Sequence, residues 1–187
     1  MSNPTIGVAM SLYNQQAYVE EAIESLLDQT RQPDRIVVVD DGSSDAGPDL
    51  VRKYETHGVV LTQVNRQGVS KVLNTAVDLT GTDFVAIQAC DDVSERIEWQ
   101  LDVALGSQIS AVFAVPTVID QASRRMPDCF ANEFFVASDH LDPLRRLFET
   151  GNWLCASSVF SAGRTSTALV DFIRDCSISK TSSSGSV

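Results

Sequence analysis

Two pairs of adjacent aspartates are the residues of this chain best suited to chemistry. Asp40-Asp41 follows directly on four aliphatic residues, and Asp91-Asp92 follows a second apolar run after three intervening residues. Each apolar run is typical of a short strand that is buried on both faces. Neighbouring carboxylates at the rim of such a core repel each other and lose hydration, so each pair requires a metal ion, a ligand donor or a helix terminus beside it.

The two pairs admit a structural and a functional interpretation. In the structural one, each pair begins a turn and caps the next helix. In the functional one, both loops converge on one cleft, where carboxylate oxygens suit Mg²⁺ or Mn²⁺ together with phosphate oxygens of a ligand. A carboxylate can also accept the imide N–H of a pyrimidine base. Either pair alone leaves both interpretations open, whereas two pairs at equivalent strand ends favour the functional one.

The apolar pattern of the first half alternates between strand and helix. Aliphatic runs predict strands over 5–11, 36–39, 59–61 and 84–87, and stripes at helical spacing predict helices over 18–27, 50–54 and 69–77. We expect Ser43, Ser44 and Asp45 to cap the middle helix. Short connections then predict an α/β fold, with a doubly wound, mainly parallel sheet and flanking helices. Ligands of such sheets lie beyond the carboxyl ends of the strands, where both acidic pairs lie.

The second half is patterned less regularly. It predicts a helix over 97–105, strands over 111–115 and 117–119, irregular chain over 121–142 and helices over 143–150 and 165–174. Residues 179–187 are rich in serine and nearly free of apolar side chains, so we expect a disordered tail there. The chain is therefore expected to form one domain over 1–178.

The charge balance excludes some partners. The 187 residues carry 14 Lys and Arg against 25 Asp and Glu, a net charge of -11, which argues against nucleic acid or an anionic membrane surface. A phosphorylated ligand would then require a divalent cation. The four widely spaced cysteines indicate reduced thiols in a cytoplasmic protein. No signal pattern and no apolar run of roughly 20 residues is present, so neither export nor a transmembrane segment is expected.

Several catalytic fingerprints are missing from the sequence. It contains no G-x-G-x-x-G after the first strand, no Walker lysine loop and no G-x-S-x-G elbow. His57 and His140 are the only histidines, which argues against a His-based triad and a metal site of the His/Cys type. Both histidines are expected at the surface.

Four motifs, in order, resemble those of family 2 glycosyltransferases. They are VAMSLYN at 8–14, AIESLLDQT at 22–30, VVDDGSSD at 38–45 and ACDD at 89–92. The resemblance covers about 5–105, and a weaker similarity appears in GNWLCASS at 151–158. It implies a GT-A fold and a nucleotide-diphosphate sugar as the substrate.

The resemblance also implies roles for five residues. Ser11 and Tyr13 would contact the base, Tyr13 by stacking, and Asp41 would accept the pyrimidine N–H. Asp91 would lie near the ribose and diphosphate. Asp92 would bind the divalent cation, Mn²⁺ or Mg²⁺, that stabilises the diphosphate as the leaving group. The loop 65–68 and the start of the next helix would border the nucleotide, where their backbone N–H groups would help to hold phosphate.

The sequence departs from the family pattern in three places. Ala89 stands where many members have a further acid, and Leu73 stands where an arginine is common. Inverting members take their general base from an acidic motif well after the region of Asn152. Here the nearest candidate is Asp171, and the general base stays unassigned. We therefore expect a C-terminally shortened chain, in which 1–105 forms the nucleotide-sugar half and 106–178 a partial acceptor half.

The leading hypothesis is metal-dependent, inverting transfer of a sugar from a UDP-linked donor to a sugar or glycolipid acceptor. Such a step belongs to polysaccharide or glycoconjugate synthesis. A domain that binds the donor without transferring the sugar stays open, as does peripheral membrane association. A receiver-type signalling domain is a weaker alternative, because its acidic pair follows the first strand rather than the second and fourth. A purely structural module would leave both pairs unexplained.

Overall fold

The computed structural model describes residues 3–95, 97–107, 111–114, 117–126 and 159–162. Its strands are β1 (Ile6–Leu12), β2 (Arg35–Asp40), β3 (Val59–Gln63), β4 (Phe84–Ala89), β5 (Ala111–Phe113) and β6 (Val159–Ala162). Its helices are α1 (Val19–Leu27), α2 (Gly47–Arg52), α3 (Val69–Thr80) and α4 (Ile97–Ser107), with a 3-10 turn η1 (Glu55–His57). The predicted alternation of strand and helix through the first half is confirmed.

The strands form one mixed sheet in the order β3-β2-β1-β4-β6-β5. β1 lies between β2 and β4 and pairs in parallel with both, and β3 extends the parallel part beyond β2. β6 runs antiparallel to β4 and to β5. The expected α/β fold with a mainly parallel sheet is therefore correct, and β1 is the strand on which the two acidic strand ends converge.

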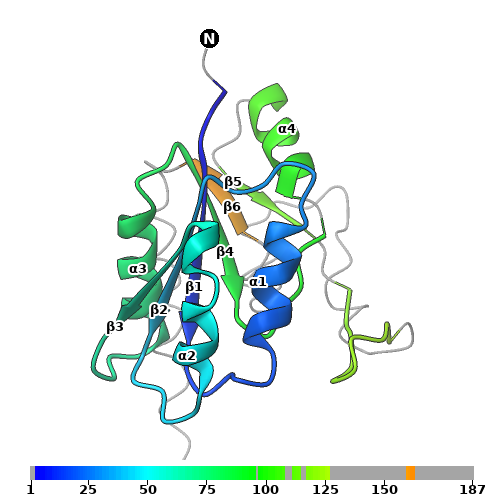
Figure 1. The fold of residues 1–187 in the computed structure, drawn as a ribbon. Coiled ribbons are helices and arrows are strands. Elements are labelled where there is room, and N and C mark those ends of the chain that lie inside the picture. Colours follow the sequence, from blue (N-terminus) through cyan, green and yellow to red (C-terminus); the bar gives the residue numbers. More distant parts are fainter. Residues whose placement is uncertain (1–2, 96, 108–110, 115–116, 127–158, 163–187) are drawn as a thin grey trace, which may run out of the picture.

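Helices cover both faces of this sheet (Figure 1). Because successive side chains of a strand point to opposite faces, Val8 and Met10 of β1 pack with α1 in one buried cluster, whereas Ala9 packs with α3 in the other. Figure 1 shows α1 and α2 side by side on one face and α3 on the opposite face. The result is a three-layer arrangement in which the parallel strands are buried on both sides, as their continuous apolar runs predict.

The expected cap of α2 is not confirmed, because Ala46 is at the N-cap position and makes no side-chain cap there. Asp45 contacts the start of the helix, since its carboxylate accepts the N–H of Gly47 at 3.0 Å. Ser43 and Ser44 do not cap it, because both bond instead to Asn14 in the neighbouring loop. The helix accordingly begins only at Gly47.

Two further differences concern the second half. The predicted strand over 117–119 is wrong, because the chain turns back at 120–123 and leaves one isolated bridge between Ile119 and Arg125. β6 was not expected, since its four residues include a serine and carry no extended apolar run. The predicted helices 143–150 and 165–174, the GNWLCASS segment, Asp171 and the tail 179–187 lie outside the described residues.

Candidate active site

The two acidic pairs meet at the carboxyl end of β1. Ser11 is in register with Val39 of β2 on one side and with Ala89 of β4 on the other. Each acidic pair begins one or two positions beyond these partners, so both pairs flank the end of the same central strand. Ser11, half-buried, lies between the two strand ends, and the expectation that both loops share one cleft stays a prediction.

Asp40 is a structural residue. It is 1% exposed, and its carboxylate accepts the N–H of Ser43 at 3.0 Å and the side-chain amide of Gln63 at 3.1 Å. These bonds hold the turn after β2 and connect it to the edge strand β3. The structural interpretation is therefore correct for this one member of the first pair.

Asp41 fastens the loop that leads into α3. The residue is 6% exposed, and its carboxylate accepts the backbone N–H of Gln67 at 2.6 Å and that of Gly68 at 3.0 Å. Gly68 precedes the first residue of α3, so the negative charge lies at the positive end of that helix. Asp41 thus occupies two of the backbone N–H groups of the loop 65–68, and the expectation that this loop and the start of α3 help to hold phosphate stays a prediction for the others.

Gly42 gives the turn after β2 a left-handed backbone conformation. Its φ is +78°, a conformation that glycine adopts without penalty. A Cβ on Gly42 would lie 3.5 Å from the backbone nitrogen of Arg66. The turn after β2 and the loop after β3 therefore form one continuous wall beside Asp41.

Tyr13 extends from the end of β1 and is 38% exposed. The guanidinium of Arg66 lies over its ring, 4.4 Å from the ring centroid. A tyrosine at this position offers a flat apolar face, as a stacking role for a base requires. Arg66 was not singled out from the sequence, because an exposed cation in a turn gives no signal of its own.

A set of reciprocal hydrogen bonds connects the loop after β1 to the loop after β2. The N–H of Asn14 donates to the hydroxyl of Ser43 at 3.0 Å, and the N–H of Ser44 donates to the Asn14 side-chain oxygen at 2.8 Å. Asn14 has a φ of +52°, uncommon for a residue other than glycine. These contacts fix the backbone directly after Tyr13, and sequence analysis missed Asn14 because its partners lie about 30 positions away.

Two further hydrogen bonds join the same loops through Gln16. The N–H of Gln16 donates to the carboxylate of Asp45 at 2.9 Å, and the N–H of Ala46 donates to the side-chain oxygen of Gln16 at 2.9 Å. Together with the Asn14 contacts, these bonds make the wall around Tyr13 a preformed structure. Such preorganisation lowers the entropic cost of binding a ligand there.

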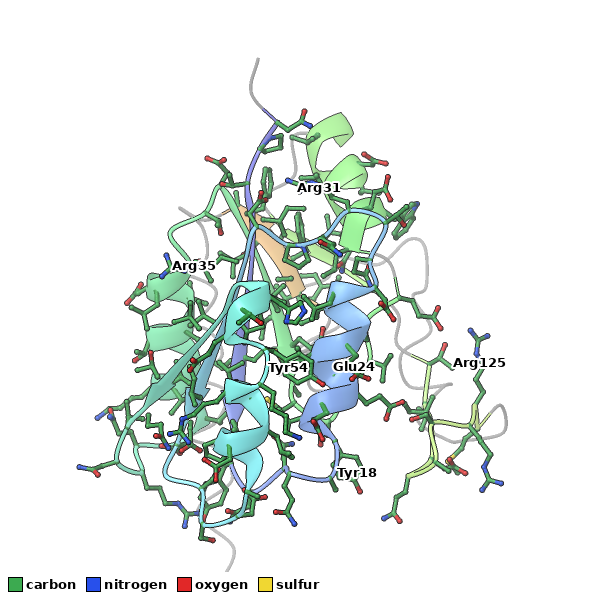
Figure 2. The ribbon with its side chains drawn as sticks, viewed as in Figure 1. Tyr18, Glu24, Arg31, Arg35, Tyr54 and Arg125 are labelled. Atoms are coloured by element: carbon green, nitrogen blue, oxygen red, sulfur yellow. The ribbon has the colours of Figure 1, made fainter. Side chains whose placement is uncertain are left out.

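The second acidic pair lines a cleft of about 190 Å³. Asp91 is exposed and Asp92 is half-buried. The other residues around the cleft come from the start of α1 and the residue before it, from the position after Asp92 and from the turn at 119–123: Tyr18, Glu21, Ala22, Val93, Ile119, Asp120, Gln121 and Ser123. Figure 2 shows Tyr18 at the end of α1 that borders this cleft.

Buried amides hold the turn that carries this pair. Gln88, 2% exposed, donates from its side chain to the carbonyl of Asp92 at 2.9 Å and accepts the hydroxyl of Ser94 at 2.6 Å. Gln29 donates to the carbonyl of Ser94 at 2.7 Å and accepts the N–H of Ile97 at 3.0 Å. A buried side chain fully engaged in this way fixes the chain around it, so Asp92 is carried by a rigid turn.

Asp120 and Glu21, which line the cleft together with the second acidic pair, bond to neighbouring side chains. Asp120 forms an ion pair with Arg124, and the hydrogen bonds from Arg124, from its backbone and from Ala122 hold the pKa of Asp120 below its usual value. Glu21 accepts the hydroxyl of Ser123 at 2.5 Å. Asp91 and Asp92 are the two carboxylates of the cleft that follow closely on the end of β4.

The donor set of the cleft fits a hard cation. Every acidic ligand candidate around it is a carboxylate, and Mg²⁺ and Mn²⁺ prefer such oxygens, usually with one or two carboxylates and the remainder from water or phosphate. Across 3–95, 97–107, 111–114, 117–126 and 159–162, no three His, Cys, Asp or Glu side chains gather closely enough to form a cage.

Cys90 and His57 behave as expected from the sequence. Cys90 is a free, buried thiol, and its burial raises its pKa far above the usual value, so it is unreactive. His57 lies at the exposed surface. The other three cysteines and His140 lie outside the described part of the chain.

No helix in the described part of the chain is long and apolar enough to cross a membrane.

Comparison with known proteins gives consistent matches. The family described as Glycosyl transferase family 2 matches residues 7–166. The glucosyltransferase WfgD of Escherichia coli, named UDP-Glc:alpha-D-GlcNAc-diphosphoundecaprenol beta-1,3-glucosyltransferase, is 26% identical over 126 residues, which cover 66% of this chain and 50% of WfgD. The chain spans half or less of the length of the curated relatives it matches.

Two solved structures show the same fold. The mannosyltransferase PcManGT from Pyrobaculum calidifontis, in complex with GDP-Man and Mn²⁺, is 27% identical with a TM-score of 0.53, and the match covers 64% of this chain and 37% of that one. S. aureus TarS 1-349 in complex with UDP is 20% identical with a TM-score of 0.66, covering 88% and 48%. The expected GT-A fold is confirmed, and the family match over 7–166 means that this chain belongs to glycosyl transferase family 2.

Proposed function

We propose that this chain binds a nucleotide-diphosphate sugar and a divalent cation at the carboxyl end of β1 and transfers the sugar to an acceptor hydroxyl. The observation that carries the proposal is the convergence of Ser11, Asp41 and Asp91-Asp92 on that strand end. A nucleotide site at the end of a central parallel strand agrees with the general position of ligands in such sheets. The family match supports the reaction type.

The base would lie against Tyr13, with Ser11 beside it. Asp41 keeps one bond on each carboxylate oxygen to the loop before α3. Because a carboxylate offers about four acceptor sites, it retains the capacity to accept one N–H of a pyrimidine. A UDP-linked donor is proposed on this chemistry, and the name of WfgD, which includes UDP-Glc, supports the same choice.

The diphosphate would lie toward Asp91 and Asp92. The chain has a net charge of -11, so two phosphates beside several carboxylates would be repelled without a cation. Asp92 would hold that ion on its rigid turn, and Asp91 would lie near the ribose and diphosphate. The bound Mn²⁺ or Mg²⁺ would supply Lewis-acid stabilisation of the departing diphosphate. The Mn²⁺ in the PcManGT complex supports a role for such an ion in the family.

Transfer would proceed by attack of the acceptor oxygen on the anomeric carbon, opposite the departing nucleoside diphosphate. The new C–O bond forms as the bond to the diphosphate breaks, and this single displacement inverts the configuration. A general base must take the proton of the acceptor hydroxyl from within hydrogen-bond reach. Asp171 remains a weak candidate for this role, and it lies outside the described residues.

Calorimetry with UDP, with and without Mn²⁺, tests the donor site. Wild-type protein is expected to bind UDP more tightly with Mn²⁺ than without it. In the presence of Mn²⁺, Asp92→Ala is expected to bind UDP at least about tenfold more weakly than wild type, because even residues that only hydrogen-bond to metal ligands have effects of this size. Asp78→Ala, which removes an exposed acid from α3, serves as the charge-matched control. Equal Mn²⁺ dependence in wild type and Asp92→Ala would remove Asp92 from the site.

Turnover of donor with a set of sugar and glycolipid acceptors tests the transfer itself. Release of UDP that depends on the acceptor would establish transfer by this chain. Tight binding without release would instead favour the alternative, a domain that holds the donor and does not transfer it. Both results leave the donor site in place and separate it from catalysis.

A further inference from the structure

Arg66 lies over the ring of Tyr13, on which the nucleotide base is proposed to stack. Its guanidinium carbon is 4.4 Å from the centroid of the Tyr13 ring, a distance typical of a cation–π contact. Tyr13 is 38% exposed and Arg66 is exposed. The planar cation therefore covers one face of the aromatic ring.

The backbone on both sides of Arg66 is held by the first acidic pair. The N–H of Val64 donates to the carbonyl of Asp40 at 2.9 Å, and the N–H of Gln67 donates to the carboxylate of Asp41 at 2.6 Å. Gly42 is close to the same segment, since a Cβ added to it would lie 3.5 Å from the Arg66 backbone nitrogen. The starting point of the Arg66 side chain is thus fixed relative to Tyr13 and Asp41.

The side chain itself is held by little else. Among the residues that the structure describes, Arg66 makes no ion pair, and its contact with Tyr13 lies at the surface. An exposed cation–π contact is weak, and stacking of a nucleotide base on an aromatic ring is stronger. A base can therefore displace the guanidinium from the Tyr13 ring at small cost.

We propose that Arg66 is the second wall of the base site, so that a bound base lies between the Tyr13 ring and the Arg66 guanidinium. The guanidinium leaves the Tyr13 ring when the base enters and then stacks on the outer face of the base. This inference rests on the proposed function and adds a residue that determines how the base is held. Arginine suits the role because its planar, delocalised group stacks on flat rings, which a lysine ammonium does not do as well.

A role in stacking has a different signature from a role in binding phosphate. A stacking residue contributes equally to uridine and to UDP, because both carry the same base. A cation that pairs with phosphate contributes to UDP alone, is replaceable by lysine and loses its effect in high salt. The three variants Arg66→Ala, Arg66→Lys and Arg35→Ala separate these signatures. Arg35 is exposed and lies at the end of β2 opposite Asp40 (Figure 2). Its replacement by alanine therefore removes the same charge as Arg66→Ala, away from the proposed base site.

The test is titration of each variant with uridine, followed by NMR, and with UDP plus Mn²⁺, followed by calorimetry at low and high salt. Arg66→Ala is expected to weaken both ligands by a similar factor, on the order of fivefold to tenfold. Arg66→Lys is expected to recover only a small part, and Arg35→Ala is expected to bind as wild type does. Circular dichroism of each variant confirms that the fold is retained.

Two results would overturn the inference while leaving the proposed function intact. One is unchanged binding of both ligands by Arg66→Ala. The other is full recovery of UDP binding in Arg66→Lys with uridine unaffected throughout, which would assign Arg66 to the diphosphate. Failure of the wild-type protein to bind either ligand with Mn²⁺ would instead overturn the proposed function, and this inference with it.

Discussion

The carboxylate of Asp41 accepts the backbone N–H of Gly68, 27 positions later in the chain, at 3.0 Å. With the second bond to Gln67, it anchors the loop that carries Arg66 and places a negative charge at the start of α3. Asp41, which is proposed to accept the N–H of the pyrimidine, thus also holds the loop that lies beside the pyrimidine. Loss of Asp41 should therefore affect stability and nucleotide binding together.

Asp41→Asn is expected to reduce the free energy of unfolding by about 1–3 kcal/mol. The amide keeps one acceptor oxygen, but its NH₂ group then faces a backbone N–H, and a nearly buried donor is left without an acceptor. Urea denaturation measures the loss, and calorimetry with UDP and Mn²⁺ is expected to show weaker binding as well. The control is Asp102→Asn, an exposed acid on α4, which should leave both quantities unchanged. Wild-type stability in Asp41→Asn would show that the two bonds contribute nothing.

Gly42 and Gly58 offer a matched pair of substitutions. Their φ values are +78° and +83°, so an alanine at either position should cost about 1–2 kcal/mol of unfolding free energy through backbone strain. A Cβ at Gly42 would meet Arg66 and Val64 at ordinary contact distance, and one at Gly58 would meet nothing within 4 Å.

Only one of the two changes lies at the proposed nucleotide site. Gly42→Ala is expected to weaken UDP binding, since a shift of this turn moves the loop that carries Arg66, whereas Gly58→Ala should bind UDP as wild type does. Chemical denaturation gives the stabilities and calorimetry gives the dissociation constants. Equal UDP affinity in both variants would mean that the turn after β2 does not position the site.

Asn14 separates backbone strain from hydrogen bonding. Asn14→Ala removes the acceptor of the Ser44 N–H and forces alanine into a φ of +52°, whereas Asn14→Gly removes the acceptor alone. We expect the alanine variant to be less stable than the glycine variant by about 1 kcal/mol, because glycine adopts this conformation freely. Thermal denaturation compares the two. The reverse order would show that chain entropy outweighs strain at this position.

The sequence was informative where local patterns determine structure. Continuous apolar runs before Asp40 and after Asp83 predicted the buried parallel strands, and the placement of the acidic pairs at strand ends followed from them. Asp41 shows the limit of this reasoning: its type indicated a ligand, whereas its partners, Gln67 and Gly68, are determined by how α3 packs on the sheet. Arg66 and Asn14 lack any periodic signal, since their contacts join loops that are distant in the chain.

The end of the mixed sheet was missed for a similar reason. β6 has four residues, and its position beside β4 depends on Phe160, whose ring stacks on that of Phe84 with centroids 5.3 Å apart. A run this short predicts neither a strand nor its partner. The pairing of β6 with both β4 and β5 is thus a property of tertiary packing.

Tyr54 gives the stability of the protein an alkaline limit. Its hydroxyl donates to the carboxylate of Glu24 at 2.8 Å, and the two side chains face each other between the segment after α2 and α1 (Figure 2). Burial, and then the hydrogen bond and charge of Glu24, raise the pKa of Tyr54 from about 10 to about 12. Since the folded protein holds this proton more tightly than the unfolded chain does, the contribution of Tyr54 is complete below pH 10 and is lost as the pH rises toward 12.

Tyr54→Phe removes the ionisable group and keeps the ring. The stability difference between wild type and Tyr54→Phe should stay constant from pH 7 to pH 10 and should then shift against wild type between pH 10 and pH 12. Thermal denaturation of both proteins over this range measures it, and the ionisations common to both proteins cancel in the difference. A difference that stays constant through pH 12 would contradict the raised pKa. A shift that begins near pH 10 would attribute the loss of stability to the hydrogen bond between Tyr54 and Glu24. The phenylalanine variant cannot donate that hydrogen bond at any pH, so its stability does not depend on this ionisation.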